Sequence, residues 1–157
     1  VTFQVIEHIQ NDVRFVKEIY RVLKPGGKLI LTTPNLLMSL SRNPWHTREY
    51  TPQSMRYILE TSFSDIEMNG VFGNEKIMQY YNANKKSVER IRKWDIFNLE
   101  RNMPRRLLQV PYDILNRFNR HKLQDKNESL VNDVKYTDYS ISEMTDKCLD
   151  YFCIATK

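Results

Sequence analysis

A Pro-Gly-Gly turn, placed between a helix-like segment and a strand-like one, constrains the fold of this chain more than any other feature. Pro25 cannot continue a helix, and Gly26 and Gly27 supply the left-handed backbone geometry that closes a helix end. The following residues, Lys28 to Thr33, are β-rich and nearly continuously apolar, which is typical of a strand covered by helices on both faces. The pattern predicts a helix, a sharp turn and a strand of a parallel sheet.

Strands and helices also alternate on both sides of this turn. Asn11 or Asp12 can cap a helix with a broad apolar face, and Thr51 with Pro52 can begin another. The predicted elements, in chain order, are a strand at Val1 to Ile6, a helix that stops at Lys24, a strand at Lys28 to Thr33, a helix from Thr51 until Ser62, a strand at Ser64 to Phe72, two helices between Ala83 and Lys122, a loop at Lys126 to Ser142 and a closing strand at Leu149 to Thr156.

Size and composition suit one globular domain. The chain has 157 residues, of which 41% are apolar and 27% charged. No apolar run approaches the roughly 20 residues of a membrane span, and no basic-then-apolar leader opens the chain, so we expect a cytoplasmic protein. Cys148 and Cys153 are separated by an odd number of residues, so one strand would place them on opposite faces; we expect neither a disulfide nor a zinc site.

The segment from Ala83 to Lys122 concentrates the positive charge of the chain. It contains 11 Lys or Arg against 4 Asp or Glu, while the whole chain has a net charge of +5. Its two predicted helices are separated or kinked by Pro104 and Pro111. This positive charge is explained either by a solvated charged face or by contact with an anionic acceptor. A membrane-surface helix would need a cleaner apolar face than these residues provide. The aromatic residues occur at helical spacing, which suits core packing better than nucleic-acid binding.

Four motifs together resemble the carboxyl half of a class I S-adenosylmethionine-dependent methyltransferase. They are Phe3-Gln-Val-Ile-Glu-His-Ile9, Tyr20-Arg-Val-Leu-Lys-Pro-Gly-Gly27, the strand Lys28 to Thr33 with Pro34-Asn35, and Glu49-Tyr50-Thr51-Pro52. The resemblance implies an α/β fold with part of a doubly wound, Rossmann-like sheet. Its strands would follow the family order 4-5-7-6, with an antiparallel seventh strand, and residues 83–122 would form a basic helical insertion within a single partial domain, 1–157.

The resemblance also implies a part that this sequence does not contain. The family's glycine-rich cofactor loop lies upstream of the matched region, and none of the four glycines here forms such a loop. We therefore expect an amino-terminal half of the domain upstream of Val1, whose strand would otherwise have an exposed edge. The resemblance favours a methyltransferase, or a fragment of one; the alternatives are a truncated, catalytically inactive binding domain and, less favoured, a nicotinamide-dependent oxidoreductase.

The resemblance assigns roles to two groups of residues. Phe3, Gln4 and Val5 would border the methionine end of S-adenosylmethionine, and His8 would act as the general base for a hydroxyl acceptor. Tyr50 and His46 would close over that acceptor from the loop after the central strand, with His46 as the second choice of base.

A metal ion is possible in the same region but is not favoured. A quinone-methylating branch of the family has a Glu-x-x-Glu-His metal pattern, of which this chain keeps Glu7 and His8 but replaces the first glutamate with Gln4, a weaker ligand for a hard cation. The implied acceptor is a small molecule or a glycan, an anionic one included, and nucleic acid is not expected.

Overall fold

The protein is described by a computed structural model over residues 1–93, 102–126 and 133–157. Two compact units are distinguished by their internal contacts: unit 1 comprises Val1–Ser39, His46–Phe72 and Ile141–Lys157, and unit 2 comprises Leu40–Trp45 and Gly73–Ser140. None of the helices in the described ranges combines the length and the apolar character that a membrane crossing requires. The predicted single domain with an insertion at 83–122 remains a prediction.

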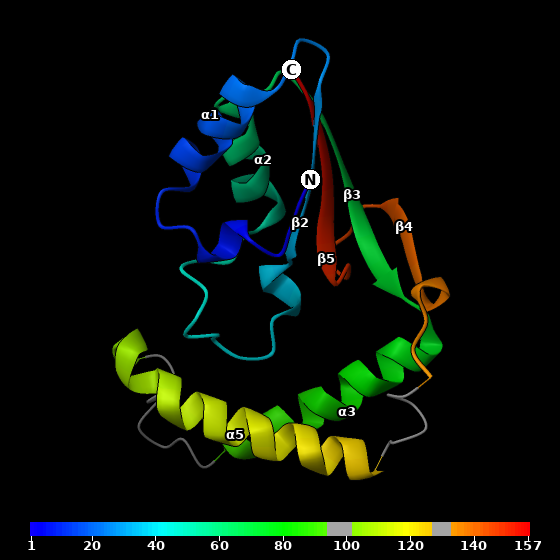
Figure 1. The fold of residues 1–157 in the computed structure, drawn as a ribbon. Helices are drawn as coiled ribbons and strands as arrows, with labels where there is room; N and C mark the ends of the chain where they lie inside the picture. Colours follow the sequence, from blue (N-terminus) through cyan, green and yellow to red (C-terminus); the bar gives the residue numbers. More distant parts are fainter. Residues whose placement is uncertain (94–101, 127–132) are drawn as a thin grey trace. The chain divides into compact units, whose positions relative to one another are not determined.

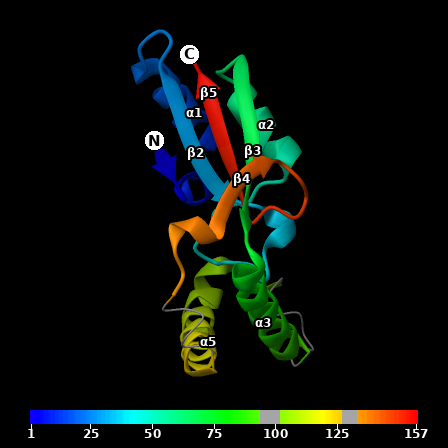
Figure 2. The same cartoon turned by 90° about the vertical axis from the view of Figure 1, so that its right-hand side faces the viewer.

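A mixed sheet forms the centre of unit 1, and two helices cover one of its faces (Figures 1 and 2). The strands, in spatial order, are β1 (Thr2–Phe3), β2 (Lys28–Pro34), β5 (Asp150–Thr156), β3 (Asp65–Gly73) and β4 (Tyr139–Glu143). β1 is parallel to β2, whereas β5 runs antiparallel to both β2 and β3. The predicted α/β class is therefore confirmed.

The two covering helices begin at the signals that the sequence provides. In α1 (Asp12–Val22) the Asn11 side chain accepts from Arg14 N at 3.0 Å, so Asn11, and not Asp12, is the cap. In α2 (Pro52–Glu60) Thr51 and Ser54 form a reciprocal capping box. Gly26 has φ +74°, which confirms the left-handed turn before β2.

The core lies between the sheet and these two helices. Burial alternates along β2, where Leu29, Leu31 and Thr33 are buried and their neighbours are not. The prediction that helices cover both faces of this strand is wrong for the described part of unit 1, where α1 and α2 lie on one face (Figure 2). The core also contains Ile6, Val16, Met55, Leu59, Tyr151, Cys153 and Ala155.

The first predicted strand is much shorter than expected. Extended structure ends at Phe3 because Gln4 has φ +53°, a left-handed conformation that is uncommon outside glycine. The chain then forms a short 3₁₀ helix, η1 (Ile6–His8), which buries Ile6 and Glu7. An apolar run of this kind therefore supplies a turn and a core contact as well as a strand.

Unit 2 contains two long helices, α3 (Glu75–Arg92) and α5 (Arg105–Lys126). α3 begins earlier than the predicted Ala83, because Asn74 caps it by accepting from Ile77 N at 3.1 Å. The predicted helical residues Trp94 and Leu99 lie outside the described residues.

The predicted loop at 126–142 is wrong where it is described. It contains η3 (Tyr136–Asp138) and most of β4, whose residues are all exposed. An edge strand without alternating burial lacks the two-residue period by which a strand is recognised. A second 3₁₀ helix, η2 (Leu36–Met38), follows β2 in unit 1.

Candidate active site

The loop after β2 returns to η1 and joins two predicted site residues. Thr47 N and Arg48 N both donate to Glu7 O, at 2.6 and 3.3 Å, and Thr47 Oγ1 donates to His8 O at 3.1 Å. The rings of His8 and His46 consequently meet edge to face, with their centroids 5.0 Å apart and their planes at 84°. The two candidate bases, 38 residues apart in sequence, therefore form one cluster.

His46 is paired with Glu49, a residue of the Glu49-Tyr50-Thr51-Pro52 motif whose contact with His46 was not predicted from the sequence. Its Nδ1 lies 2.7 Å from Glu49 Oε1, and the two side chains are only 15% and 9% exposed. Ser39 Oγ donates to the other oxygen of Glu49. This pairing favours the tautomer in which Nδ1 donates to Glu49 and Nε2 is able to accept a proton. The signal in the sequence was the three-residue spacing of a histidine and an acid on one short loop.

Glu7 is the buried acid of the cluster. Its side chain is 1% exposed; Oε2 accepts from Thr33 Oγ1 at 3.0 Å, and Oε1 lies 3.9 Å from His8 Nε2. The His8 side chain, in contrast, is 46% exposed. Thr33 ends the buried face of β2, so the strand itself sets the position of this carboxylate.

Glu7, His8 and His46 could together hold a metal ion. Each offers one ligand atom, and these atoms lie within 4.8 Å of one another. Two imidazoles and one carboxylate are a common ligand set for zinc and other divalent transition metals. Glu49 would then be the carboxylate that orients a metal-bound histidine. The sequence did not favour a metal at Glu7 and His8; the structure adds His46 as a third group within reach of both.

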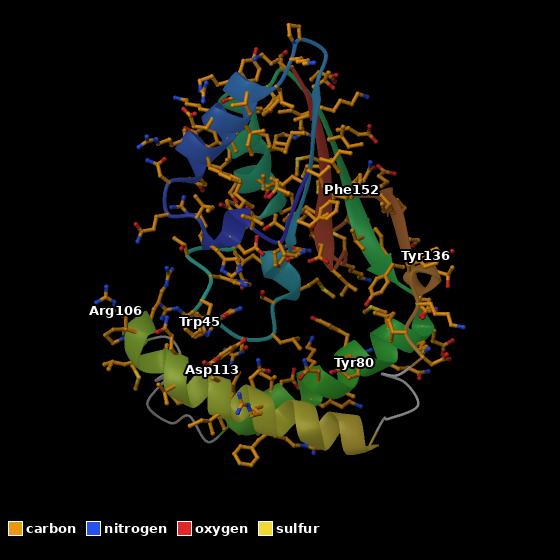
Figure 3. All side chains as sticks on the ribbon, in the orientation of Figure 1. Trp45, Tyr80, Arg106, Asp113, Tyr136 and Phe152 are labelled. Atoms are coloured by element: carbon orange, nitrogen blue, oxygen red, sulfur yellow. The ribbon has the colours of Figure 1, made fainter. Side chains whose placement is uncertain are left out.

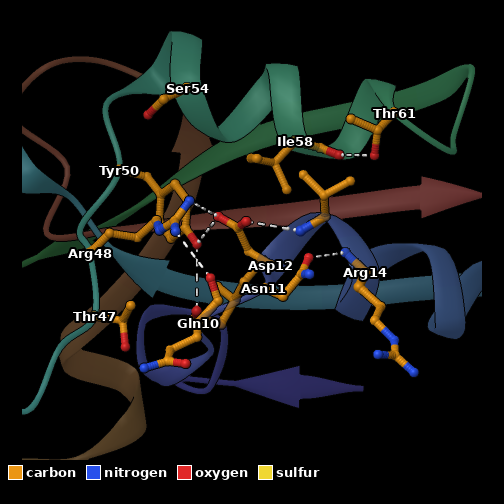
Figure 4. A network of polar contacts seen from close by, with 12 residues as sticks. Gln10, Asn11, Asp12, Arg14, Thr47, Arg48, Tyr50, Ser54, Ile58 and Thr61 are labelled. Atoms are coloured by element: carbon orange, nitrogen blue, oxygen red, sulfur yellow. Dashed lines mark hydrogen bonds and ion pairs between the residues drawn. The ribbon is translucent and has the colours of Figure 1, made fainter.

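Tyr50 belongs to a buried polar network and not to an open surface (Figure 4). Its hydroxyl donates to Asp12 Oδ2 at 2.9 Å, and Arg48 Nη1 donates to the same oxygen at 2.7 Å. Arg48 Nη2 also donates to Gln10 O at 3.1 Å. Burial, followed by the hydrogen bond to Asp12, raises the pKa of Tyr50, so the phenol stays protonated. The described contacts make Tyr50 an anchor of the loop; its predicted contact with an acceptor remains a prediction.

Asn35 fixes the end of β2 from a buried position. Its Nδ2 donates to the carbonyl oxygens of Asp146 and Cys148, at 3.1 and 2.8 Å, and its Oδ1 accepts from Leu37 N and the Tyr151 hydroxyl. Both side-chain atoms are therefore satisfied inside the protein. Asn35 joins the carboxyl end of β2 to the segment that leads into β5.

The three residues expected to border a cofactor lie at the carboxyl end of β1, the edge of the sheet at which parallel strands place ligands. Phe3 is 55% exposed and Val5 37% exposed, so two apolar side chains face outward around the strained Gln4. Gln4 N donates to Thr32 O at 2.9 Å, which fixes this conformation against β2. Their contact with the cofactor remains a prediction.

The two cysteines take no part in this cluster. Both are free and buried, and burial raises the pKa of each thiol, that of Cys153 to about 12. Both belong to the hydrophobic core of unit 1.

Parts of the chain are similar to known proteins. The family described as "Methyltransferase domain" matches residues 1–31, which include β1, η1, α1 and the start of β2. A probable S-adenosylmethionine-dependent methyltransferase of Mycolicibacterium smegmatis is 44% identical over 46% of this chain and 30% of its own length. A protein of the same description from Mycobacterium tuberculosis is 40% identical over 49% of this chain and 30% of its own length.

Among solved structures, phosphoethanolamine N-methyltransferase 2 of Haemonchus contortus is similar with a TM-score of 0.44 and 22% identity, covering 99% of this chain and 32% of that chain. The chain spans about a third of the length of the curated relatives that it matches. In residues 1–31, and over about half of its length, the chain is thus similar to S-adenosylmethionine-dependent methyltransferases.

Proposed function

We propose that this chain is part of an enzyme that transfers a methyl group from S-adenosylmethionine to a hydroxyl group, and that it supplies the base for that reaction. The observation that carries the proposal is the His46–Glu49 pair, 2.7 Å apart and largely buried, in edge contact with His8 at the carboxyl end of the parallel strands. The relatives named as methyltransferases supply the reaction class.

The order of the strands supports a family numbering. We assign β1, β2, β5 and β3 to the family's fourth, fifth, seventh and sixth strands, since they lie side by side in that order with β5 antiparallel to its neighbours. Phe3, Gln4 and Val5 would then hold the methionine end of the cofactor. The cofactor, when bound, supplies a methyl group on a positively charged sulfur, and the sulfur is the leaving group in a direct displacement.

His46 is the better placed of the two candidate bases. Methyl transfer to a hydroxyl requires that a proton leave the oxygen, and a positioned base contributes typically 10²–10⁴-fold to the rate. His46 Nε2 would accept that proton while Glu49 stabilises the charged ring through Nδ1. The sequence favoured His8 because His46 lies on a loop; two backbone bonds from that loop to Glu7 remove this objection.

His8 would orient the acceptor or the neighbouring ring. Its side chain is 46% exposed, against 15% for His46, and its Nε2 lies 3.9 Å from Glu7 Oε1. A small molecule or a glycan fits a site with exposed apolar residues and an imidazole pair. Contact between an anionic acceptor and the basic residues 83–122 remains a prediction from the sequence.

Steady-state kinetics of the full-length protein test this proposal. We expect His46→Ala to lower kcat by about a hundredfold or more, and Glu49→Gln by roughly tenfold with a shifted ionisation in the pH–rate profile. His8→Ala should lower kcat less than tenfold, and Tyr57→Phe on the exposed face of α2 serves as the matched control. If His46→Ala retains more than about a tenth of wild-type turnover, the proton leaves by another route and catalysis depends on alignment.

The same experiment separates the enzyme from an inactive binding domain. A full-length protein that binds S-adenosylmethionine in calorimetry but shows no methyl transfer to any hydroxyl acceptor supports the binding domain. Loss of turnover in His46→Ala with unchanged cofactor affinity supports the enzyme.

A further inference from the structure

Helix α5 of unit 2 carries an apolar stripe that is open to solvent. Leu107, Val110, Ile114 and Phe118 are spaced by three or four residues, so they lie on one face of the helix, and they are 64%, 66%, 51% and 72% exposed. In contrast, Leu108 and Tyr112 on another face are half-buried. Four large apolar side chains at such exposure on one face mark an interaction surface.

This separation of faces corrects an expectation from the sequence. Taken together, the apolar residues of α5 are spread too widely around the helix for a surface-binding face. Leu108 and Tyr112 belong to the packed side, whereas Leu107, Val110, Ile114 and Phe118 form the exposed stripe, with Leu115, 47% exposed, next to it. The helix therefore has two apolar faces, one of which packs inside unit 2.

The border of the stripe is basic. Arg106 and Arg117 lie along one side of it and are exposed, and a shallow hollow is lined by Val110, Asp113, Ile114, Arg117 and Phe118. Asp113 is engaged, since its Oδ1 accepts from the indole nitrogen of Trp45 at 3.1 Å (Figure 3). Over its whole length α5 has six Lys or Arg against two Asp. The surface thus offers apolar contact and positive charge together.

We propose that α5 binds the surface of an anionic lipid bilayer, with Leu107, Val110, Ile114 and Phe118 in the acyl boundary and Arg106 and Arg117 against the phosphate groups. Insertion of an amphipathic helix uses buried apolar area together with attraction to anionic lipids, and both components are present here. The axis of α5 lies parallel to the membrane.

A second copy of the chain fits this surface less well. Two copies joined through the stripe would bring their exposed Arg106 and Arg117 borders into one interface, where like charges cost binding energy. A lipid surface with negative head groups meets the same arginines with opposite charge.

Co-sedimentation of the full chain with unilamellar vesicles tests the proposal. Vesicles of phosphatidylcholine with about a third phosphatidylglycerol should bind the chain at least tenfold more tightly than phosphatidylcholine alone at low salt, and added salt should weaken the binding. The double variant Ile114→Glu with Phe118→Glu should abolish binding. Arg106→Glu with Arg117→Glu should reduce binding to anionic vesicles to the level seen with neutral ones.

The control is Tyr57→Glu, which alters an equally exposed aromatic residue, 68% exposed, on α2 of unit 1. It should bind vesicles like the wild type, and circular dichroism should show the same helix content for every variant. Equal binding by the stripe variant and the wild type would overturn the proposal. The surface would be assigned to a second copy if the wild-type chain does not bind vesicles but forms a dimer in sedimentation velocity, and if the stripe variant is monomeric.

Discussion

Replacing Tyr50 with phenylalanine would test whether the loop that carries His46 is held in place by the buried network of Asp12, Arg48 and Tyr50. The ring would stay in the core, where Tyr50 is 1% exposed, and only the hydroxyl that donates to Asp12 at 2.9 Å would be lost. Asp12 would keep Arg48 at 2.7 Å, so the buried carboxylate would not become isolated.

The expected loss of stability follows from these contacts. A hydrogen bond to a charged group contributes about 1.5–3 kcal/mol to the free energy of unfolding. Because Arg48 still pairs with Asp12 in Tyr50→Phe, we expect a loss at the lower end of this range, about 1.5–2 kcal/mol. For a chain of this size that corresponds to a fall in Tm of roughly 3–8 °C. Tyr57→Phe, at an exposed tyrosine, should change the unfolding free energy by less than about 0.5 kcal/mol.

The raised pKa of Tyr50 gives a second measurement on the same variant. The phenol ionises more readily in the unfolded chain, so the wild type should lose unfolding free energy as pH rises above about 10, by roughly 1.4 kcal/mol per pH unit from this group. Tyr50→Phe should lack this component. Urea unfolding at several pH values measures both effects; a loss under about 0.5 kcal/mol at pH 7, with an unchanged alkaline slope, would refute the network's role.

Three further measurements follow from other contacts. Burial raises the pKa of Cys153 to about 12, so urea unfolding between about pH 9 and 12 should show a loss of roughly 1.4 kcal/mol per pH unit that Cys153→Ala removes. Gly70→Ala should cost about 1–3 kcal/mol in thermal unfolding, because its Cβ would stand 2.5 Å from that of Cys148, and a neutral result would mean that the strand yields there. Calorimetry of the 157-residue chain alone should show very weak binding of S-adenosylmethionine, since the sequence has no glycine-rich loop; micromolar affinity would contradict this.

The fold was predictable where one local signal decides the structure. The Pro25-Gly26-Gly27 turn, the Thr51-Pro52 helix start and the apolar β2 and β5 strands all have such signals, and the structure has each of them within a residue or two. β4 and the early part of α3 were missed, because a fully exposed edge strand and a polar helix lack the periodic burial that reveals an element.

The candidate site was predictable in its members more than in their contacts. His8, His46 and Glu7 were singled out from the sequence, and they meet in the structure. The contacts of Glu49 with His46 and of Thr33 with Glu7 were not predicted, because a hydrogen bond between side chains depends on how the loop returns to η1. That return is fixed by backbone bonds from Thr47 and Arg48, which no side-chain pattern encodes.

The central position of β5 has a consequence for how the sheet is completed during synthesis. β5 is the last strand in the sequence, yet it pairs on both sides, with Leu29 opposite Ala155 in β2 and Asp65 opposite Thr156 in β3. Until residues 150–156 have left the ribosome, β2 and β3 each present an unpaired edge, and contacts this distant in sequence form slowly. We therefore expect the nascent chain to need protection from aggregation until β5 has been made, and a cut just before Asp150 to leave the sheet in two halves.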